Sequence, residues 1–570
     1  MDNPTHRVLS VPELVVLIAS FLSPYDTSHW MQTCRTAYRQ LESTFWSHLN
    51  LTASYTDPSV LPRYRHHFRT IQVDWHQTGH LEALVEELPL FETRQTNKIE
   101  LLNLKKLVLR SKAFVVKEAE MDAFVEVLSY TRNLTVLDIP GDVLHHAGSA
   151  VYFLEIIRED LPNLQRLAFS IADVEAPIAH RLLKVCFNHP QLVDLQCDFM
   201  INMFLYPMVV NGGGVCDPRF AALLKFLQDT DKKKADTGKP TGLRLKSLVL
   251  PLINGGYPRD FLFPFLRSHV PHLERLGIPL IHRKYNVQDL KDAILEGCPK
   301  LQHIVSNNFL GYEGGKCALF DVVRYCIPSG LRSFRGSFHD VLFKGAGSRD
   351  LVETLLEYHA TTLEQFELLD HEGVSSVHIN SVLAKCRRLR ELRIDACERG
   401  IRNSWRAAIT YRDAASGVWI CHDIEVLYLR LDPIVTVLVA DTIQDTVDQK
   451  GKETYAQIGR LVKLEELGLG CTVSGPVMKD LTLENGWLAE LAGLKELRHF
   501  HMLTDFWTSM GQAEIEFMVA NWPKLERISI DLEEDYSSEV EEFSKPHWQW
   551  LEEKRPYIVL TVNEWSRERA

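Results

Sequence analysis

Apolar residues recur along most of the chain in one short pattern. The pattern is LxxLxL or a close relative, in which apolar residues, mostly leucine or isoleucine, occupy the first and fourth places and usually the sixth. A proline often stands two places before the first leucine. The clearest copies lie at 161–169, 189–197, 270–278, 298–306 and 522–530. The alternation at the end of each copy has the period of a half-buried strand. The pattern therefore predicts a series of short β-strands.

The copies are spaced like the units of a repeat array. Looser copies begin at Leu104, Leu134, Leu245, Leu331, Leu363, Leu389, Ile424, Leu464 and Leu497, which gives fourteen units, and residues 68–73 are a degenerate fifteenth. Most first leucines follow one another at intervals of 26 to 36 residues. Recurrence at such a period is typical of a solenoid.

The residues between the strands predict helices. Ile379, Val382, Leu383 and Cys386 follow the spacing i, i+3, i+4, i+7, and the same spacing occurs at 121–128 and 515–522. Such a set forms one apolar stripe of an amphipathic helix. The recurring proline then ends the helix. Each unit is thus a strand plus a helix, and neighbouring units must stack to bury their apolar faces.

This array resembles the leucine-rich-repeat family, in particular its longer, helix-containing and cysteine-bearing subtypes. The resemblance covers roughly residues 100–531 and implies an α/β solenoid, an irregular horseshoe with strands on its concave wall and helices outside. The family places Asn or Cys three residues after the third apolar position, and here that residue is found at Cys397. We therefore expect the ladder of side-chain hydrogen bonds made by that residue to be mostly absent and the arc to be uneven.

Three stretches depart from the repeat. Long, polar intervals predict insertions near 199–242 and 432–456, which we interpret as surface loops. Residues 541–570 are predicted to cap the array, with a last strand at 558–562. They could instead fold back onto the concave face. The repeat region is accordingly assigned to 51–540, with about 14–15 irregular repeats.

The first fifty residues follow another pattern. Leu14, Leu17, Ile18 and Phe21 form one helix face, and Pro12 stands at a position favoured in a first helical turn. Ser23-Pro24 then ends this helix before a second one begins. A helical unit of some forty residues can hardly close a core of its own. Its remaining apolar surface should therefore be covered by a partner or by the end of the solenoid.

This segment resembles the F-box. The matching residues are Pro12, Glu13, Leu14, Ile18, Phe21, Leu22, Ser23, Asp26, Cys34, Arg35 and Trp46. The chain departs from the family where Thr27-Ser28 replace a leucine and where the aromatic residue after Cys-Arg is displaced to Tyr38. The resemblance implies a helical domain over 1–50 that binds a Skp1-type adaptor linked to a cullin. Its adaptor-binding residues would be Pro12, Glu13, Leu14, Ile18 and Leu22.

Charge and composition narrow the functional classes. The chain of 570 residues has a net charge of −12, which disfavours binding to nucleic acid or to an anionic membrane. Its longest apolar stretch, residues 11–22, is too short to span a bilayer. No secretory signal opens the chain, and its eleven cysteines are scattered without a CxxC pair. We expect buried thiols and a cytoplasmic or nuclear location.

No motif supports catalysis, a cofactor or a metal. Asp236-Thr-Gly matches the aspartic-protease triplet only once, in a lysine-rich segment, whereas such an enzyme needs two carboxylates. The segment 311–316 lacks the glycine and the hydroxyl residue of a phosphate loop. The histidine pairs at 66–67 and 145–146 lack further ligands at zinc spacing. We therefore expect a protein that is not an enzyme and needs no cofactor.

Candidate client-binding residues alternate with the apolar strand positions. These neighbours of the buried leucines should face the concave wall. Arg335, Arg393, Tyr428 and Arg430 stand out among them, because Arg and Tyr are enriched at interface hot spots. Glutamates interleave with them, so a solvated wall of mixed charge is the alternative.

Three functions are compatible with this organisation. The resemblance favours the substrate-recognition subunit of a Skp1–cullin–F-box ubiquitin ligase, with a client protein on the concave face. A second reading is a leucine-rich-repeat interaction scaffold unrelated to ubiquitination. A third is a GTPase-activating solenoid that supplies an arginine finger.

Overall fold

The structure, a computed structural model, describes the chain in segments. These are residues 11–19, 24–33, 35–51, 64, 66–74, 103–110, 124, 128, 131–144, 147–171, 176–199, 221–222, 225–226, 228–229, 232, 243–250, 259–277, 287–307, 322–324, 327, 330–337, 347–369, 374–395, 408–432, 442–471, 481–484, 486–503, 510–532 and 546–564. The chain divides into two compact units, 1–274 with 296–299 and 275–295 with 300–570.

The first unit contains three N-terminal helices followed by strands and helices in alternation. Its strands are β1 (His48–Leu51), β2 (Thr70–Asp74), β3 (Lys106–Arg110), β4 (Val136–Leu144), β5 (Arg166–Ile171), β6 (Asp194–Phe199) and β7 (Ser247–Val249). Its helices are α2 (Pro12–Ala19), α3 (Pro24–Thr33), α4 (Arg35–Phe45), α8 (Ala147–Asp160), α9 (Ala176–Asn188) and α11 (Arg259–His269). Each strand pairs in parallel with the next.

The second unit repeats the alternation. Its strands are β8 (Arg275–Gly277), β9 (His303–Asn307), β10 (Ser333–Ser337), β11 (Gln365–Leu369), β12 (Glu391–Asp395), β13 (Ile409–Thr410), β14 (Val426–Asp432), β15 (Glu466–Cys471), β16 (His499–Leu503), β17 (Arg527–Leu532) and β18 (Val559–Glu564). Its helical segments are α12 (Val287–Gly297), α14 (Gly347–His359), α15 (Ser376–Lys385), α16 (Tyr411–Ala414), α17 (Thr442–Gly459), the 3-10 helix η3 (Leu488–Gly493), α18 (Gln512–Asn521) and α19 (Pro546–Lys554). Its strands are parallel as well.

The leucine pattern sets both the strands and their register. Every one of the fourteen motifs leads into a strand, and the degenerate copy at 68–73 leads into β2. Leu107, Leu137, Leu167 and Leu195 face one another on successive strands and are fully buried. A shift by one residue would turn this whole row towards solvent, so burial specifies the pairing.

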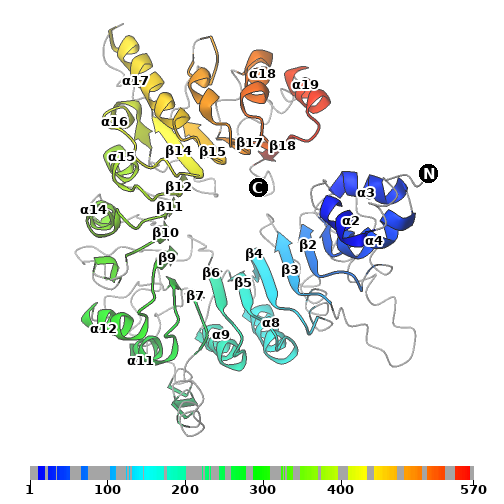
Figure 1. Cartoon of the computed structure of the whole chain (residues 1–570). Coiled ribbons are helices and arrows are strands. Elements are labelled where there is room, and N and C mark those ends of the chain that lie inside the picture. The colour runs from blue at the N-terminus through cyan, green and yellow to red at the C-terminus, as the bar shows by residue number, and fades with distance from the viewer. Residues whose placement is uncertain are drawn as a thin grey trace. The chain divides into compact units, whose positions relative to one another are not determined.

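The described residues of the predicted helical stripes are mostly buried. Ile379, Val382, Leu383 and Cys386 of the α15 region are all buried, as are Ile515, Met518 and Trp522 around α18. Within each unit the repeat helices lie on one side of the strands (Figure 1). Strand and helix therefore alternate as an α/β solenoid of the leucine-rich-repeat type.

Buried polar side chains join neighbouring repeats on the helix side. The ring nitrogens of His189 lie near two carbonyl oxygens, with 2.8 Å from Nδ1 to Val185 O and 3.0 Å from Nε2 to Ile157 O. His359 accepts from Leu331 N at 3.1 Å and donates through Nε2 to Val323 O at 2.7 Å. Burial lowers the pKa of His359, which keeps the neutral form that this bonding requires. The His189 contacts involve carbonyl groups in the last turns of α9 and α8.

Five cysteines carry buried thiols, as predicted. They are Cys186, Cys197, Cys298, Cys386 and Cys421. Burial raises the pKa of the Cys186 thiol to about 12, so it stays protonated and packs as a small apolar group.

One predicted loop is a helix. The polar stretch inside 432–456 was expected to be a surface loop, but residues 442–459 form α17. Thr454 and Tyr455 are fully buried on its inner side. The inner side thus carries polar Thr454 and Gln457 beside Tyr455 and Ile458, all buried, so the polarity of the sequence did not reveal the packed face of this helix. Most of the other predicted insertion, 199–242, and Cys397 lie outside the described residues.

Both ends of the repeat region differ in detail from expectation. Strand β1 begins at His48, so the sheet starts inside the segment 1–50 assigned to the helical domain. At the other end, β18 pairs with β17 and forms the predicted last strand, preceded by α19. The described part of 541–570 therefore continues the sheet of the second unit.

Among the described residues, no helix combines the length and the apolar character needed to cross a membrane.

Candidate functional site

The N-terminal helices form a small core of their own. Val15 and Ala19 of α2, Met31 of α3 and Leu41 of α4 are buried together. Val16, Trp30, Tyr38 and Phe45 pack around them and are partly buried. One side of α2 thus faces this core, and the opposite side of the helix faces away from it.

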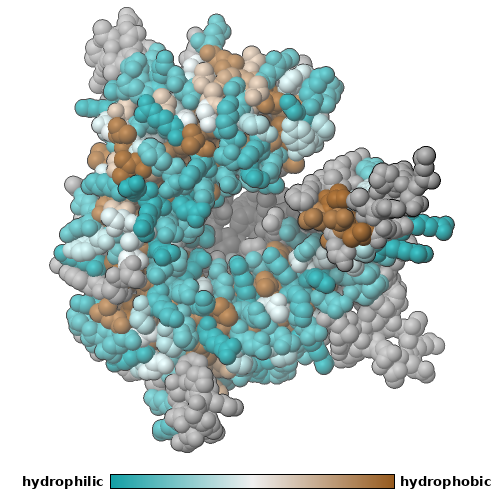
Figure 2. Space-filling view, in the orientation of Figure 1, coloured by the Kyte–Doolittle hydropathy of each residue, from teal (hydrophilic) through white to brown (hydrophobic). Residues whose placement is uncertain are grey.

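The outer side of α2 is apolar and exposed. Val11, Leu14, Leu17 and Ile18 retain 38%, 40%, 53% and 39% of their surface. Figure 2 shows hydrophobic surface on these N-terminal helices. Val11, Leu14 and Ile18 follow the spacing i, i+3, i+7 and so lie along one helix face. We call these four residues the α2 outer face. A helix that is apolar on both sides indicates a surface covered by a partner.

The other predicted adaptor-binding residues are placed only in part. Pro12 is exposed at the start of α2, and Glu13 follows it in the helix. Leu22 lies outside the described residues. The structure therefore brings Pro12 together with Leu14 and Ile18, and adds Val11 and Leu17, which the sequence analysis did not assign to the adaptor.

Aromatic contacts attach this helical unit to the first strands. Trp46 stacks on Tyr64 with 4.2 Å between ring centroids, and the Tyr38 hydroxyl lies 2.7 Å from the Tyr64 hydroxyl. Arg69 N and Thr70 N both donate to Ser47 O at the start of the sheet. These contacts pack the three N-terminal helices, and with them the α2 outer face, against the segment that contains β1 and β2.

A second candidate surface is the strand face of the second unit. We use this name for the side of β8–β17 opposite the buried apolar row of Phe334, Phe366, Leu392, Leu427, Leu467, Phe500 and Ile528. Arg335, Glu367, Arg393 and Tyr428 are register partners on β10, β11, β12 and β14. The structure thus aligns three of the four predicted client-binding residues in one row.

Arg393 is the centre of a dense electrostatic cluster. Its Nε donates to Glu391 Oε1 at 2.6 Å, and its Nη2 donates to Glu466 Oε2 at 3.3 Å. Its guanidinium carbon lies 4.6 Å from the centre of the Tyr428 ring. Burial alone lowers the pKa of Arg393, but the hydrogen bond to Glu391 and the charges of Glu466 and Glu391 outweigh it, so the pKa is raised. Arg393 therefore remains a fixed cation.

Tyr428 is held in the same cluster. Its hydroxyl donates to Glu466 Oε1 at 2.5 Å, and its ring lies 5.7 Å from the ring of His501. Burial, together with the hydrogen bond to Glu466, raises the pKa of Tyr428. The phenol is therefore a neutral donor with a fixed ring plane.

Gly468 provides the space for this ring. A Cβ at position 468 would lie 2.2 Å from Tyr428 Cδ1 and 2.8 Å from Cγ, so the whole ring would have to rotate. Glycine at this position lets the ring lie against β15, where Tyr428 and Gly468 are register partners.

We expect Gly468→Ala to destabilise the second unit by about 1–3 kcal/mol, because the displaced ring loses its contact with Arg393 and its bond to Glu466. Gly417→Ala is the matched control, since its Cβ would meet its nearest neighbour at 3.7 Å. Equilibrium denaturation of the three proteins measures the difference. Equal stability of both variants would show that the Tyr428 ring is not confined there.

The other two predicted client-binding residues, Arg335 and Arg430, differ in solvent exposure. Arg335 pairs with Glu367, with 3.3 Å between Nε and Oε2, and its side chain keeps 40% of its exposure. Arg430 is only 7% exposed, so its side chain is the least accessible of the four predicted residues.

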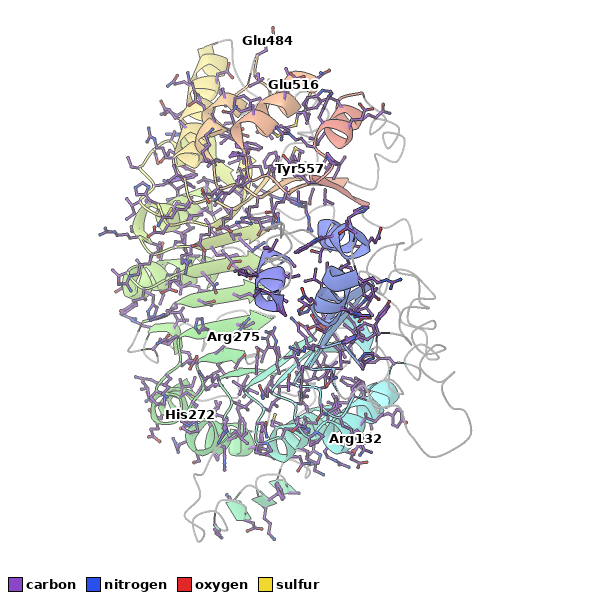
Figure 3. The ribbon with its side chains drawn as sticks, turned by 45° about the vertical axis from the view of Figure 1, so that its right-hand side comes forward. Arg132, His272, Arg275, Glu484, Glu516 and Tyr557 are labelled. Carbon is purple, nitrogen blue, oxygen red and sulfur yellow. The ribbon has the colours of Figure 1, made fainter. Side chains whose placement is uncertain are left out.

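A hollow of about 220 Å³ opens on the strand face next to the Arg393 cluster. Arg275, His303, Ser333, Gln365 and Glu391 line it, and they form one register row across β8–β12. Arg275 extends from β8 (Figure 3). Phe334, Arg335 and Glu367 complete the lining.

The sequence analysis missed Arg275, Glu466 and Gly468 as parts of these surfaces. All three lie on predicted strands at positions that alternate with buried leucines, so the same rule could have included them. Only the register shows that Glu466, 73 residues after Arg393, reaches it.

Within the described residues, no group of three or more His, Cys, Asp or Glu side chains is arranged to hold a metal ion.

Comparisons with known proteins do not assign a family. No family sequence model and no curated protein matches the chain. Among solved structures, a complex of Rad7 and Elc1 from yeast matches with 16% identity and a TM-score of 0.28, over 56% of this chain and 84% of the other. The leucine-rich repeat-containing protein LegL7 from Legionella pneumophila matches with 16% identity and a TM-score of 0.27, over 50% of this chain and 89% of the other. What the chain's own elements establish is a leucine-rich-repeat solenoid that begins with a helical unit whose outer face is apolar.

Proposed function

We propose that this chain is the substrate-recognition subunit of a Skp1–cullin–F-box ubiquitin ligase. The α2 outer face binds a Skp1-type adaptor, and the strand face of the second unit binds a client protein. The observation that carries the proposal is the two-sided apolar helix α2, with Val15 and Ala19 in the core and Leu14 and Ile18 exposed.

The character of the α2 outer face supports an adaptor over a simple cap. A residue that merely completes the core of its own unit would be buried, as Val15 is. Leu14, Leu17 and Ile18 are large exposed apolar side chains, and Leu14 and Ile18 occupy positions that resemble the adaptor-binding residues of the F-box. Burying such side chains in an interface contributes about 1.5–3 kcal/mol each when burial is complete.

The proposed mechanism is proximity, without bond chemistry by this chain. An adaptor and cullin would hold the helical unit, while the strand face would hold the client. Joining both events in one assembly raises the effective concentration of client at the conjugating enzyme.

The geometry of the arginines disfavours a GTPase-activating role. An arginine finger must extend its guanidinium into the phosphate site of a partner. Arg393 is instead bound to two carboxylates and lies over Tyr428. Arg335 is paired with Glu367. These arginines are suited to organising the strand face.

The test is co-purification of the full chain with a Skp1-type adaptor, beside a variant that carries Pro12→Ala, Leu14→Ala and Ile18→Ala. We expect a stoichiometric complex with the unmodified chain and at least about 100-fold weaker binding by the variant, since exposed apolar anchors dominate such interfaces. The three side chains are exposed or partly exposed, so the circular dichroism spectrum should not change.

Val377→Ala is the matched control, because Val377 is an exposed apolar residue of helix α15. It should leave the complex intact. Failure of the folded, unmodified chain to bind the adaptor would instead favour an interaction scaffold unrelated to ubiquitination, with α2–α4 as an end cap.

A further inference from the structure

The hollow on the strand face has an ordered polar lining. Its five-residue register row reads Arg275, His303, Ser333, Gln365, Glu391 from β8 to β12. A basic residue thus stands at one end, neutral hydrogen-bonding residues stand between, and an acidic residue stands at the other end. A ligand lying across the strands would meet a change of charge along its length.

The depth of the hollow has a simple cause. Ser333, at the middle of the row, is much smaller than the imidazole of His303 and the amide of Gln365 on either side. Phe334, the next residue on β10, also borders the hollow, but its side chain is fully buried on the opposite side of the sheet. The volume of about 220 Å³ suits one or two small side chains of an extended segment more than a large ring system.

The neighbouring register row forms one side wall of the hollow, and the opposite charges of its Arg335 and Glu367 side chains balance each other. Arg335 and Glu367, two places further along β10 and β11, are paired with each other. Glu391 accepts one hydrogen bond from Arg393 through Oε1, and a carboxylate can accept several. The Glu391 side chain keeps 26% of its surface. Its carboxylate can therefore accept from a ligand as well.

From this arrangement we propose that the hollow binds an extended peptide segment of the client with an acidic side chain at one end and a basic side chain at the other. The acidic group lies towards Arg275, the basic group towards Glu391, and small polar residues lie over Ser333. This inference names the client chemistry and rests on the proposed client-binding role of the strand face.

The strand spacing sets the distance between the two charges. Five parallel strands span about 19 Å at about 4.8 Å per interval, and an extended peptide rises about 3.3 Å per residue. Because the receptor side chains also reach towards the ligand, the two charged residues of the client should stand about four to six positions apart.

The test measures fluorescence anisotropy of labelled peptides with the full chain. The probe is Gly-Glu-Ser-Gly-Ser-Gly-Lys-Gly, and the composition-matched control is Gly-Ser-Gly-Glu-Lys-Ser-Gly-Gly, which brings the charges together. We expect the first peptide to bind at least about tenfold more tightly, since each misplaced charge loses its partner. Equal affinity of the two peptides, or no measurable binding of either at millimolar concentration, overturns the proposal.

Charge reversal distinguishes recognition from structural damage. Arg275→Glu and Glu391→Lys should each weaken binding of the probe at least about tenfold, because each places like charges together. The double variant should restore binding, since its charge order is merely reversed and the peptide can lie in the opposite direction. Loss of binding in the double variant as well would contradict the proposal.

Arg387→Glu is the matched control, because Arg387 is an exposed arginine in the turn before β12, outside the strands and outside the hollow. It should leave probe binding unchanged. Co-purification of each variant with the Skp1-type adaptor is measured in parallel. A failed peptide test with an intact adaptor complex rejects this inference alone, whereas loss of adaptor binding by the unmodified chain rejects the proposed function.

Discussion

Leu41→Ala is expected to unfold the N-terminal helical unit while the repeat strands of the second unit stay folded. Leu41 is fully buried in a core whose other buried members are Val15, Ala19 and Met31. Truncating a buried leucine costs about 2–5 kcal/mol, and a unit with so small a core has little stability to lose. Adaptor binding should fall with it, although Leu41 does not lie on the α2 outer face.

Hydrogen exchange resolved by segment is the measurement for this prediction. Amides of α2–α4 should lose protection in the variant, and amides of β14–β17 should keep it. Leu17→Ala is the control, because it truncates an exposed leucine of the same unit. Unchanged protection of α2–α4 in Leu41→Ala would show that the three helices do not depend on this core.

Trp522→Ala is expected to destabilise the second unit by about 3–5 kcal/mol, the usual cost of removing a buried aromatic side chain. Trp522 is 1% exposed, packs edge to face on Phe500 with 5.2 Å between ring centroids, and donates through Nε1 to Leu491 O at 3.0 Å. The substitution removes this packing and leaves a buried carbonyl without its donor. Denaturant unfolding followed by circular dichroism reports the loss.

Trp522→Phe separates the two contributions. It keeps an aromatic ring against Phe500 but cannot donate to Leu491 O, so we expect a smaller cost of about 1–3 kcal/mol. If both variants lost equal stability, the hydrogen bond rather than the packing would dominate. If neither lost stability, α18 would not anchor this part of the solenoid.

The strands were predictable because their signal is local and repeated. A leucine at each motif position is buried against the same position of the neighbouring repeat, as Leu137 and Leu167 show. Helix α17 was harder to predict, because most of its residues are polar and its buried side itself includes Thr454 and Gln457 beside Tyr455 and Ile458. Polarity alone does not distinguish a loop from a helix exposed along one face.

The candidate surfaces were predictable only in outline. Leucine, valine and isoleucine residues occur on all sides of helix α2. The periodicity of apolar residues therefore could not show that Val15 faces the core while Leu14 faces outward. Likewise, alternation placed Arg393 and Tyr428 on the strand face, but their contacts with Glu466 depend on the register of β12, β14 and β15. Contacts between distant repeats arise from stacking, which no single repeat encodes.

We propose that the α2 outer face is the docking surface for a Skp1-type adaptor. Isothermal titration of the full chain with the adaptor at several temperatures tests it most directly, because burial of apolar surface gives a negative heat-capacity change on binding. We expect one-to-one binding with a negative heat-capacity change, lost in Leu14→Asp with Ile18→Asp and retained in Val377→Asp. Binding that is unaffected by the Leu14 and Ile18 substitutions, or no binding by the folded chain, would contradict it.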